Sequence, residues 1–139
     1  MIDLPRDGGR SGVYRAARAD DVLQAARAHG LHVASIRLAG RDGKPALLRA
    51  LAAALKFPDW FGGNWDALED CLTDLSWIPS AGYLILLEGC GGLPDDDFGV
   101  LRDVLASAAE FWSERGKPFY AVIVAGPDSL PELGRAAKA

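Results

Sequence analysis

The chain has 139 residues, of which 15 are basic and 19 acidic, and half are hydrophobic. A chain of this length buries roughly two thirds of the surface that its unfolded form exposes, so we expect one domain that needs no disulfide, metal or partner to fold. The formal net charge of −4 and a pI near 5.1 argue against direct binding of nucleic acid, which depends on basic side chains.

The apolar runs and the cysteines indicate a cellular compartment. No apolar run approaches the ~20 residues that span a bilayer, and the first ten residues lack the apolar core of a signal peptide. Cys71 and Cys90 are too few for a disulfide framework and do not resemble a metal-ligand cluster. We therefore expect a cytoplasmic protein with no membrane contact and no cofactor.

Elements in the first half of the chain alternate between strand and helix. Residues 13–16 favour a short strand, and the helix that follows is expected to run from an N-cap at Asp20 to Gly30. β-Branched residues predict a strand at 33–38, before a glycine-containing turn. Pro45 is expected in the first turn of the next helix, where leucines recur at helical spacing.

The second half continues this alternation. Asn64 is a suitable N-cap for a helix over 65–75, and residues 83–87 and 121–124 are apolar runs typical of strands buried on both faces. Between these strands we expect a long helix over 97–114, ended by Gly116. Its expected buried residues are Val100, Leu101, Val104, Leu105, Ala108, Phe111 and Trp112. From Pro127 onward we expect a poorly ordered tail or a short surface helix.

The predicted order is therefore β, α, β, α, α, β, α, β. Buried strands that are joined by helices require crossover connections, which place neighbouring strands parallel to one another. The sequence thus predicts an α/β fold: a small, mainly parallel sheet of three to four strands packed with helices.

Charge is divided unevenly along the chain. Residues 1–56 hold ten basic and five acidic side chains, whereas residues 57–139 hold five basic and fourteen acidic ones. No Lys or Arg occurs between Phe57 and Leu101, a stretch that contains nine acids. A surface of one sign attracts partners of the opposite sign and speeds their encounter, which favours a basic partner. A solvated helix face is the alternative interpretation of such a run.

The expected helix 65–75 carries its acids on one side. Its apolar residues fall on one face, and the opposite face holds Asp66, Glu69, Asp70 and Asp74. Asp66, Asp70 and Asp74 follow one another at four-residue spacing without a base between them, and each such pair costs a few tenths of a kcal/mol. Local violations of this kind tend to fall at functional sites, where an external cation can complete the pairing.

The segment before this helix combines large rings with glycines. Trp60 and Phe61 precede Gly62 and Gly63, a composition that suits a protein interface because the backbone there can be approached closely. The alternative is that the rings belong to the core and the glycines form only a turn.

The segment FPDWFGGNWDALEDCLT, from Phe57 to Thr73, resembles the signature of the barstar family, the intracellular inhibitors of barnase-type ribonucleases. The resemblance covers residues 31–126 and implies a small parallel sheet packed with helices. Residues 1–30 look like an N-terminal extension with a short strand and helix, and residues 127–139 look like a C-terminal tail.

The resemblance also implies a mechanism and a set of partner-binding residues. In this family the acidic helix plugs the nuclease active site, so Asp66 and Asp70 would face its cationic groups, with Asp70 mimicking the RNA phosphate. The implied partner-binding set is Trp60, Gly62, Gly63, Asn64, Trp65, Asp66, Glu69, Asp70, Thr73 and Asp74. Trp60 stands in the place of an interface tyrosine, while Glu69 departs from the pattern because the prototype has tryptophan there.

We therefore expect an inhibitor or immunity protein, a monomer that forms a 1:1 heterodimer with a basic ribonuclease, either barnase-like or a ribonuclease toxin. One alternative is an acidic adaptor or immunity protein for another basic partner. A further alternative is a carboxylate- or Mg²⁺-dependent enzyme that uses Asp66 and Asp70, or residues 95–97. The chain has no phosphate-binding glycine loop, however, and an acidic N-terminal cap of the long helix also explains residues 95–97.

Overall fold

The computed structural model describes residues 2, 4–5, 7–39 and 42–133. Four strands form one sheet in the order β1-β4-β3-β2, and every neighbouring pair among them is parallel. The strands are β1 (Gly12–Ala16), β2 (His32–Arg37), β3 (Tyr83–Glu88) and β4 (Phe119–Val124). The helices are α1 (Ala19–Ala28), α2 (Lys44–Ala54), α3 (Trp65–Leu72) and α4 (Asp95–Ser113), with a short 3₁₀ turn, η1, at Cys90–Gly92. This confirms the predicted α/β class, element order and small parallel sheet.

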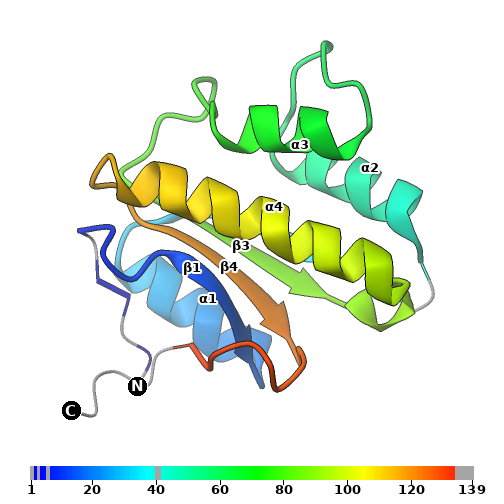
Figure 1. The fold of residues 1–139 in the computed structure, drawn as a ribbon. Coiled ribbons are helices and arrows are strands. Elements are labelled where there is room, and N and C mark those ends of the chain that lie inside the picture. The colour runs from blue at the N-terminus through cyan, green and yellow to red at the C-terminus, as the bar shows by residue number, and fades with distance from the viewer. Residues whose placement is uncertain (1, 3, 6, 40–41, 134–139) are drawn as a thin grey trace.

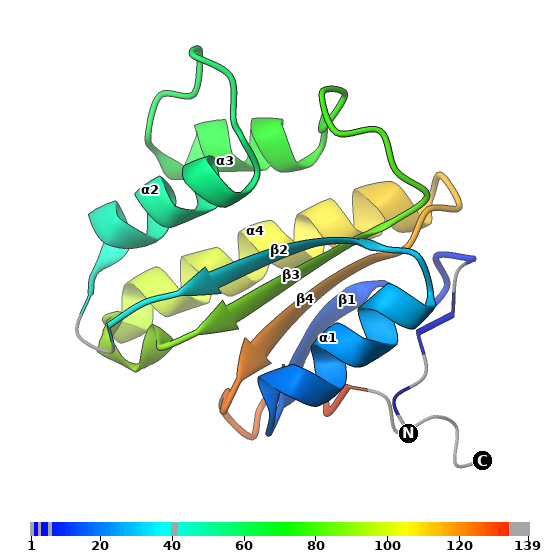
Figure 2. The ribbon, with the colours of Figure 1, turned by 180° about the vertical axis from the view of Figure 1, so that it is seen from behind.

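Helices cover both faces of the sheet. Figures 1 and 2 show α2, α3 and α4 on one side and α1 on the other. The two faces have separate cores, and β3 contributes alternate residues to each: Tyr83, Ile85 and Leu87 to one, Leu84 and Leu86 to the other. The apolar run of β3 is therefore continuous because the strand is buried on both sides.

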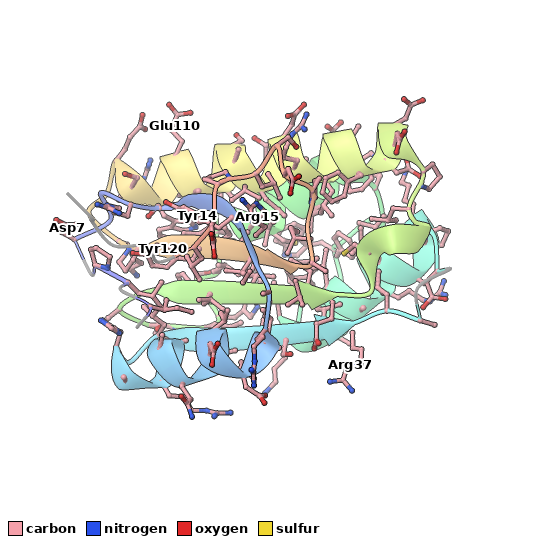
Figure 3. The ribbon with its side chains drawn as sticks, turned by 90° about the horizontal axis from the view of Figure 1, so that it is seen from below. Asp7, Tyr14, Arg15, Arg37, Glu110 and Tyr120 are labelled. Atoms are coloured by element: carbon pink, nitrogen blue, oxygen red, sulfur yellow. The ribbon has the colours of Figure 1, made fainter. Side chains whose placement is uncertain are left out.

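The first 30 residues contribute to the sheet and its second layer. β1 pairs with β4 from Gly12 opposite Tyr120 to Ala16 opposite Val124, and α1 buries Val22 and Ala26 on the second face. The rings of Tyr14 and Tyr120 lie with their centroids 6.2 Å apart (Figure 3). Removal of this segment would expose one edge of β4 and the second core to water.

Residues 131–133 run beside the outer edge of β1. The backbone N–H of Arg15 donates to the carbonyl of Pro131 at 2.8 Å, and that of Leu133 donates to the carbonyl of Arg15 at 2.9 Å. Leu130 and Leu133 are buried. This segment is thus ordered beside the sheet, because an edge strand offers unpaired backbone groups that a neighbouring segment can satisfy. The remaining part of the expected tail, residues 134–139, lies outside the described residues.

Helix starts differ from the sequence expectation at two places. Arg18, not Asp20, is the N-cap residue of α1, and Asp20 lies in its first turn. Likewise α4 begins at Asp95 after Pro94, so Asp95, Asp96 and Asp97 form its first turn and cap nothing through their side chains. A negative charge in the first turn is favourable without a capping hydrogen bond, because the helix dipole is positive there. On α4, Val100 was expected to be buried but is 37% exposed.

Candidate partner-binding surface

α3 lies on the outer side of the helix layer, beside α4 and α2, and the loop that joins α2 to α3 stands out from the body of the protein (Figures 1 and 2). The inner side of α3 carries Leu68, Cys71 and Leu72, which are completely buried. The helix is therefore held to the domain by one apolar face, which leaves its opposite face to solvent.

The start of α3 is fixed by its predicted cap. The side-chain oxygen of Asn64 accepts a 2.8 Å hydrogen bond from the backbone N–H of Ala67. Gly63, just before the cap, has a φ of +74°, a backbone conformation that glycine adopts without steric cost. The glycine and the asparagine together set the direction in which the chain enters the helix.

The end of α3 comes earlier than predicted. The helix stops at Leu72 and not at residue 75, because Thr73 caps it and Leu75 has a φ of +51°. The Thr73 hydroxyl donates a 2.8 Å hydrogen bond to the carbonyl of Glu69. Asp74 therefore lies in the turn after the helix, where its carboxylate accepts from the backbone N–H of Ser76 at 3.2 Å. The expected repulsion between Asp70 and Asp74 as a helical pair does not apply.

Asp66 and Asp70 lie one turn apart on the outer face, and both are exposed. Among the described residues neither carboxylate has a salt-bridge or hydrogen-bond partner. The ion pairs in that part of the chain lie elsewhere: Arg18–Asp21, Arg37–Glu88 and Arg102–Asp103. The outer face of α3 thus presents two negative charges that no basic residue of the described chain neutralises.

Glu69 differs from these two aspartates. Its side chain is half-buried at the junction with α4, where the hydroxyl of Ser107 donates a 2.9 Å hydrogen bond to Glu69 Oε2. No signal in the sequence pairs these two residues, which are 38 positions apart. The carboxylate of Glu69 is therefore engaged with the protein itself.

The aromatic residues before α3 separate into surface and core. Trp60 is 55% exposed, and its ring meets that of Trp77 edge-on at 6.4 Å between centroids. Trp77 is held in turn, because its indole N–H donates a 2.8 Å hydrogen bond to the carbonyl of Leu55. Phe61 packs on Phe57 and the core. Trp60 therefore lies at the surface, whereas Phe61 belongs to the core.

Trp65, the first residue of α3, is half-buried and packs against the core. The ammonium group of Lys44, at the start of α2, lies 5.3 Å from the centroid of the Trp65 ring. A cation at this distance from an aromatic ring is attracted by the ring's negative face. This contact ties the beginning of α2 to the beginning of α3.

Both cysteines are buried thiols, as expected from their positions. Burial, together with the nearby carboxylates of Asp70 and Asp74, raises the pKa of Cys71 to about 11. Burial likewise raises the pKa of Cys90 to about 11. A thiol with a raised pKa stays protonated at neutral pH and is a poor nucleophile or metal ligand.

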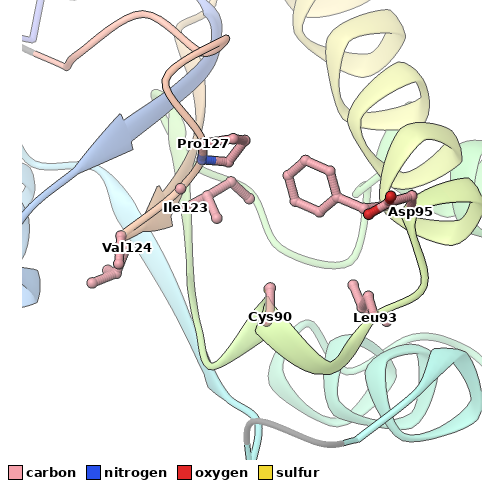
Figure 4. Close-up of a pocket in the computed structure, with 10 residues that line it drawn as sticks. Cys90, Leu93, Asp95, Ile123, Val124 and Pro127 are labelled. Carbon is pink, nitrogen blue, oxygen red and sulfur yellow. The ribbon is translucent and has the colours of Figure 1, made fainter.

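Other features do not form a second candidate site around α3. A hollow of about 330 Å³ lies at the carboxyl ends of β3 and β4, beside the start of α4, and is lined by Cys90, Leu93, Phe98, Ile123 and Pro127 among others (Figure 4). Within the described residues there is no group of three or more His, Cys, Asp or Glu side chains that could hold a metal ion. In the same part of the chain, no helix has the length and apolar character that crossing a membrane requires.

A comparison with solved structures shows the fold. The chain is similar to the ORC2 protein of Aeropyrum pernix, solved as ADPNP and ADP complexes, with a TM-score of 0.53 and 16% sequence identity. The similar region covers 85% of this chain but 36% of that protein, so the chain spans little more than a third of its length. At this identity the likeness concerns the α/β arrangement alone.

Comparison with curated proteins gives no match. The sequence model of one family does match: its description is barstar (barnase inhibitor), and it covers residues 31–124. The match includes α3, its capping residues and the three strands β2, β3 and β4. It confirms the resemblance read from residues 57–73, and the chain belongs to the Barstar family.

Proposed function

We propose that this protein inhibits a basic ribonuclease by laying the outer face of α3 over the active site. Asp66 and Asp70 would pair there with the cationic groups that otherwise hold RNA phosphates. The observation that carries the proposal is the pair of exposed carboxylates, one helical turn apart, without a cationic partner among the described residues. The matching family, described as a barnase inhibitor, supports the class of partner.

Electrostatics explains why such a face would favour this partner. Two carboxylates in water gain little from a distant charge, but once the interface excludes water the same charges interact in a lower effective dielectric. Pairs of opposite charge across an interface speed the encounter and slow dissociation. A nuclease active site is built to bind phosphates, so its cations are already placed for two anionic groups.

The residues around the two aspartates would complete the contact. Trp60 offers an exposed ring that is braced by Trp77, and such rings contribute apolar area at interfaces. Gly62 and Gly63 are exposed and admit close approach of a partner's backbone. At the other end of α3, Thr73 and Asp74 form the rim of the proposed surface.

The first experiment is a titration into a ribonuclease assay. Barnase, and any basic ribonuclease encoded beside this gene, would be mixed with increasing amounts of the purified protein while RNA cleavage is followed. We expect cleavage by the matching enzyme to stop at a 1:1 ratio. Unchanged cleavage by every enzyme tested would contradict the proposal.

The second experiment locates the surface with charge-neutral variants of equal shape. Asp66→Asn and Asp70→Asn would be compared with Asp20→Asn, an exposed aspartate on α1 at the opposite side of the sheet. We expect each α3 variant to weaken the complex by about 2 to 5 kcal/mol, a general range for buried interfacial charge pairs that draws on the barnase–barstar complex itself. The Asp20 variant should bind as the wild type does.

Isothermal titration calorimetry measures the three affinities. Equal binding by all three variants would place the contact on another face. A complex that depends on Asp70 but leaves RNA cleavage unchanged would instead support the adaptor alternative, in which the same face binds a basic protein that is not a ribonuclease.

A further inference from the structure

Two hydrogen bonds run from α4 to α3. The Ser107 hydroxyl donates to Glu69 Oε2 at 2.9 Å, and the Trp112 indole N–H donates to the carbonyl of Leu72 at 2.8 Å. The first joins two side chains in the middle of the contact, while the second satisfies a backbone group at the end of α3. Leu68 of α3 also shares one apolar core with the buried residues of α4, so hydrogen bonds and apolar packing both hold α3 against α4.

α3 needs such support more than the other helices do. It has eight residues, and a helix this short is not stable by itself in water. Asp66 and Asp70 repel each other along its outer face, because like charges at four-residue spacing destabilise a helix. The orientation of the two aspartates is therefore set by the packing of α3 on the domain.

Glu69 is the one acid of the helix that turns toward α4. Within the described residues Ser107 is the donor to its carboxylate, and no base forms an ion pair with it. A hydrogen bond to an ionised carboxylate is shorter and stronger than one between neutral groups. The bond therefore restrains α3 at its centre, directly beside Asp70 in the sequence.

We propose that Ser107 is a positioning residue for the acidic surface: by holding Glu69 against α4 it keeps α3 in one orientation, so that Asp66 and Asp70 are aligned before a partner arrives. Glu69 then acts as an anchor to α4 and not as a direct contact. This inference rests on the proposed function for its purpose, but the restraint itself can be measured without a partner. Alignment in the free state raises affinity because less ordering is needed on binding.

The thiol of Cys71 provides the measurement. Cys71 lies on the inner face of α3 and is completely buried, so a thiol reagent reaches it when α3 separates from the domain or the whole protein unfolds. In a Cys90→Ala background, Cys71 is the single thiol of the chain. We expect Ser107→Ala to raise its labelling rate by about 3- to 10-fold, the size of effect that a modest change in a local opening equilibrium produces.

The control is Ser113→Ala on the same helix. Ser113 is half-buried, and its side chain makes no hydrogen bond within the described residues, so its variant should label at the parent rate. Urea unfolding of each variant separates local from global opening. If the labelling rate rises no more than the measured loss of global stability predicts, the proposal is overturned. Equal labelling rates for the Ser107 and Ser113 variants would also overturn it.

Two variants of Glu69 test the anchor directly. Glu69→Gln keeps an oxygen that accepts from Ser107 but loses the charge, so it should label more slowly than Glu69→Ala, which should label as fast as Ser107→Ala. The double variant Ser107→Ala/Glu69→Ala should be no faster than either single one, because both remove the same bond. Labelling of the Gln variant as fast as that of Glu69→Ala, or additive effects in the double variant, would contradict the proposal.

The binding measurement distinguishes this inference from the proposed function. With a ribonuclease that the wild type inhibits, Ser107→Ala should raise Kd, because a smaller fraction of the free protein holds α3 in the aligned orientation, while Ser113→Ala leaves Kd near the parent value. An unchanged Kd for Ser107→Ala would overturn the positioning role although inhibition stands. If no ribonuclease is inhibited, the proposed function fails, and the Cys71 labelling rates still decide whether Ser107 restrains α3.

Discussion

The indole N–H of Trp112 on α4 donates a buried 2.8 Å hydrogen bond to the carbonyl oxygen of Leu72, the last residue of α3. The last four carbonyls of any helix lack partners within it, and a buried one must find a partner elsewhere. Here a side chain 40 residues later in the sequence supplies it. The helix that carries the acidic face is thus ended partly by a contact with another helix.

Trp112→Phe should destabilise the protein by about 1 to 3 kcal/mol, because the Leu72 carbonyl would stay buried without a donor. Urea unfolding measures the change. The matched control is Trp60→Phe, at a ring that is 55% exposed, where the free energy of unfolding should change by less than about 0.5 kcal/mol. Equal effects at both positions would contradict a stabilising role for the Trp112 hydrogen bond.

Asn64→Ala should cost about 1 kcal/mol of stability, since it removes the acceptor for the Ala67 N–H at the start of α3. Asn64→Asp places a carboxylate oxygen where the amide oxygen of Asn64 accepts this bond, so it should lose little stability. Thermal or urea unfolding of the pair tests this, and an Asp variant as unstable as the Ala variant would show that the capping bond is not what matters.

Gly89→Ala should destabilise the domain by more than about 3 kcal/mol. Gly89 has a φ of +80°, and an added Cβ would come 2.1 Å from the carbonyl oxygen of Leu38, where the chain leaves β2. Gly91 is the control, because its added Cβ would meet nothing within 4 Å. Gly91→Ala should change the free energy of unfolding by less than about 1 kcal/mol, as followed by urea unfolding.

Stability should fall as the pH rises from about 9 toward 11. In the folded state burial raises the pKa of the Cys71 and Cys90 thiols from 9.0 to about 11. The unfolded chain then releases its thiol protons first, so the stability they contribute is complete below pH 9 and is lost toward pH 11. Urea midpoints at pH 8 and pH 10.5 should differ less in a Cys71→Ala/Cys90→Ala variant. An identical decline in both proteins would refute this origin.

If the proposed function holds, association with the ribonuclease should slow as salt is added. Exposed charges more than about 10 Å apart are screened at 0.1 M ionic strength, so steering toward Asp66 and Asp70 weakens. Stopped-flow rates at several salt concentrations should show a shallower dependence for Asp70→Asn than for Asp20→Asn. Equal slopes for these two variants would indicate that steering arises from another part of the surface.

Local patterns in the sequence predicted much of the site. The leucine spacing and the Asn64 cap predicted where α3 begins and which side it buries, because both depend on residues within one or two turns. Continuous apolar runs predicted the central strands β3 and β4. The exposure of Asp66 and Asp70 follows from the same periodicity.

Contacts between distant segments were not predictable in this way. The end of α3 at Leu72 depends partly on Trp112, and the half-buried position of Glu69 depends on Ser107. Residues 131–133 run beside β1 since its outer edge offers backbone groups to pair with, although the composition from Pro127 onward is typical of a tail.

The sequence by itself determined the class of fold, the order of its elements and the acidic face of α3, because these follow from periodicity and caps that act over a few residues. Only the tertiary structure decided which acids remain unpaired: Asp66 and Asp70 stay in solvent, while Glu69 meets the Ser107 hydroxyl and Asp74 leaves the helix for a turn. The physical reason is that the partner of a polar group is set by what packs beside it, and α4 comes beside α3 only when the sheet assembles.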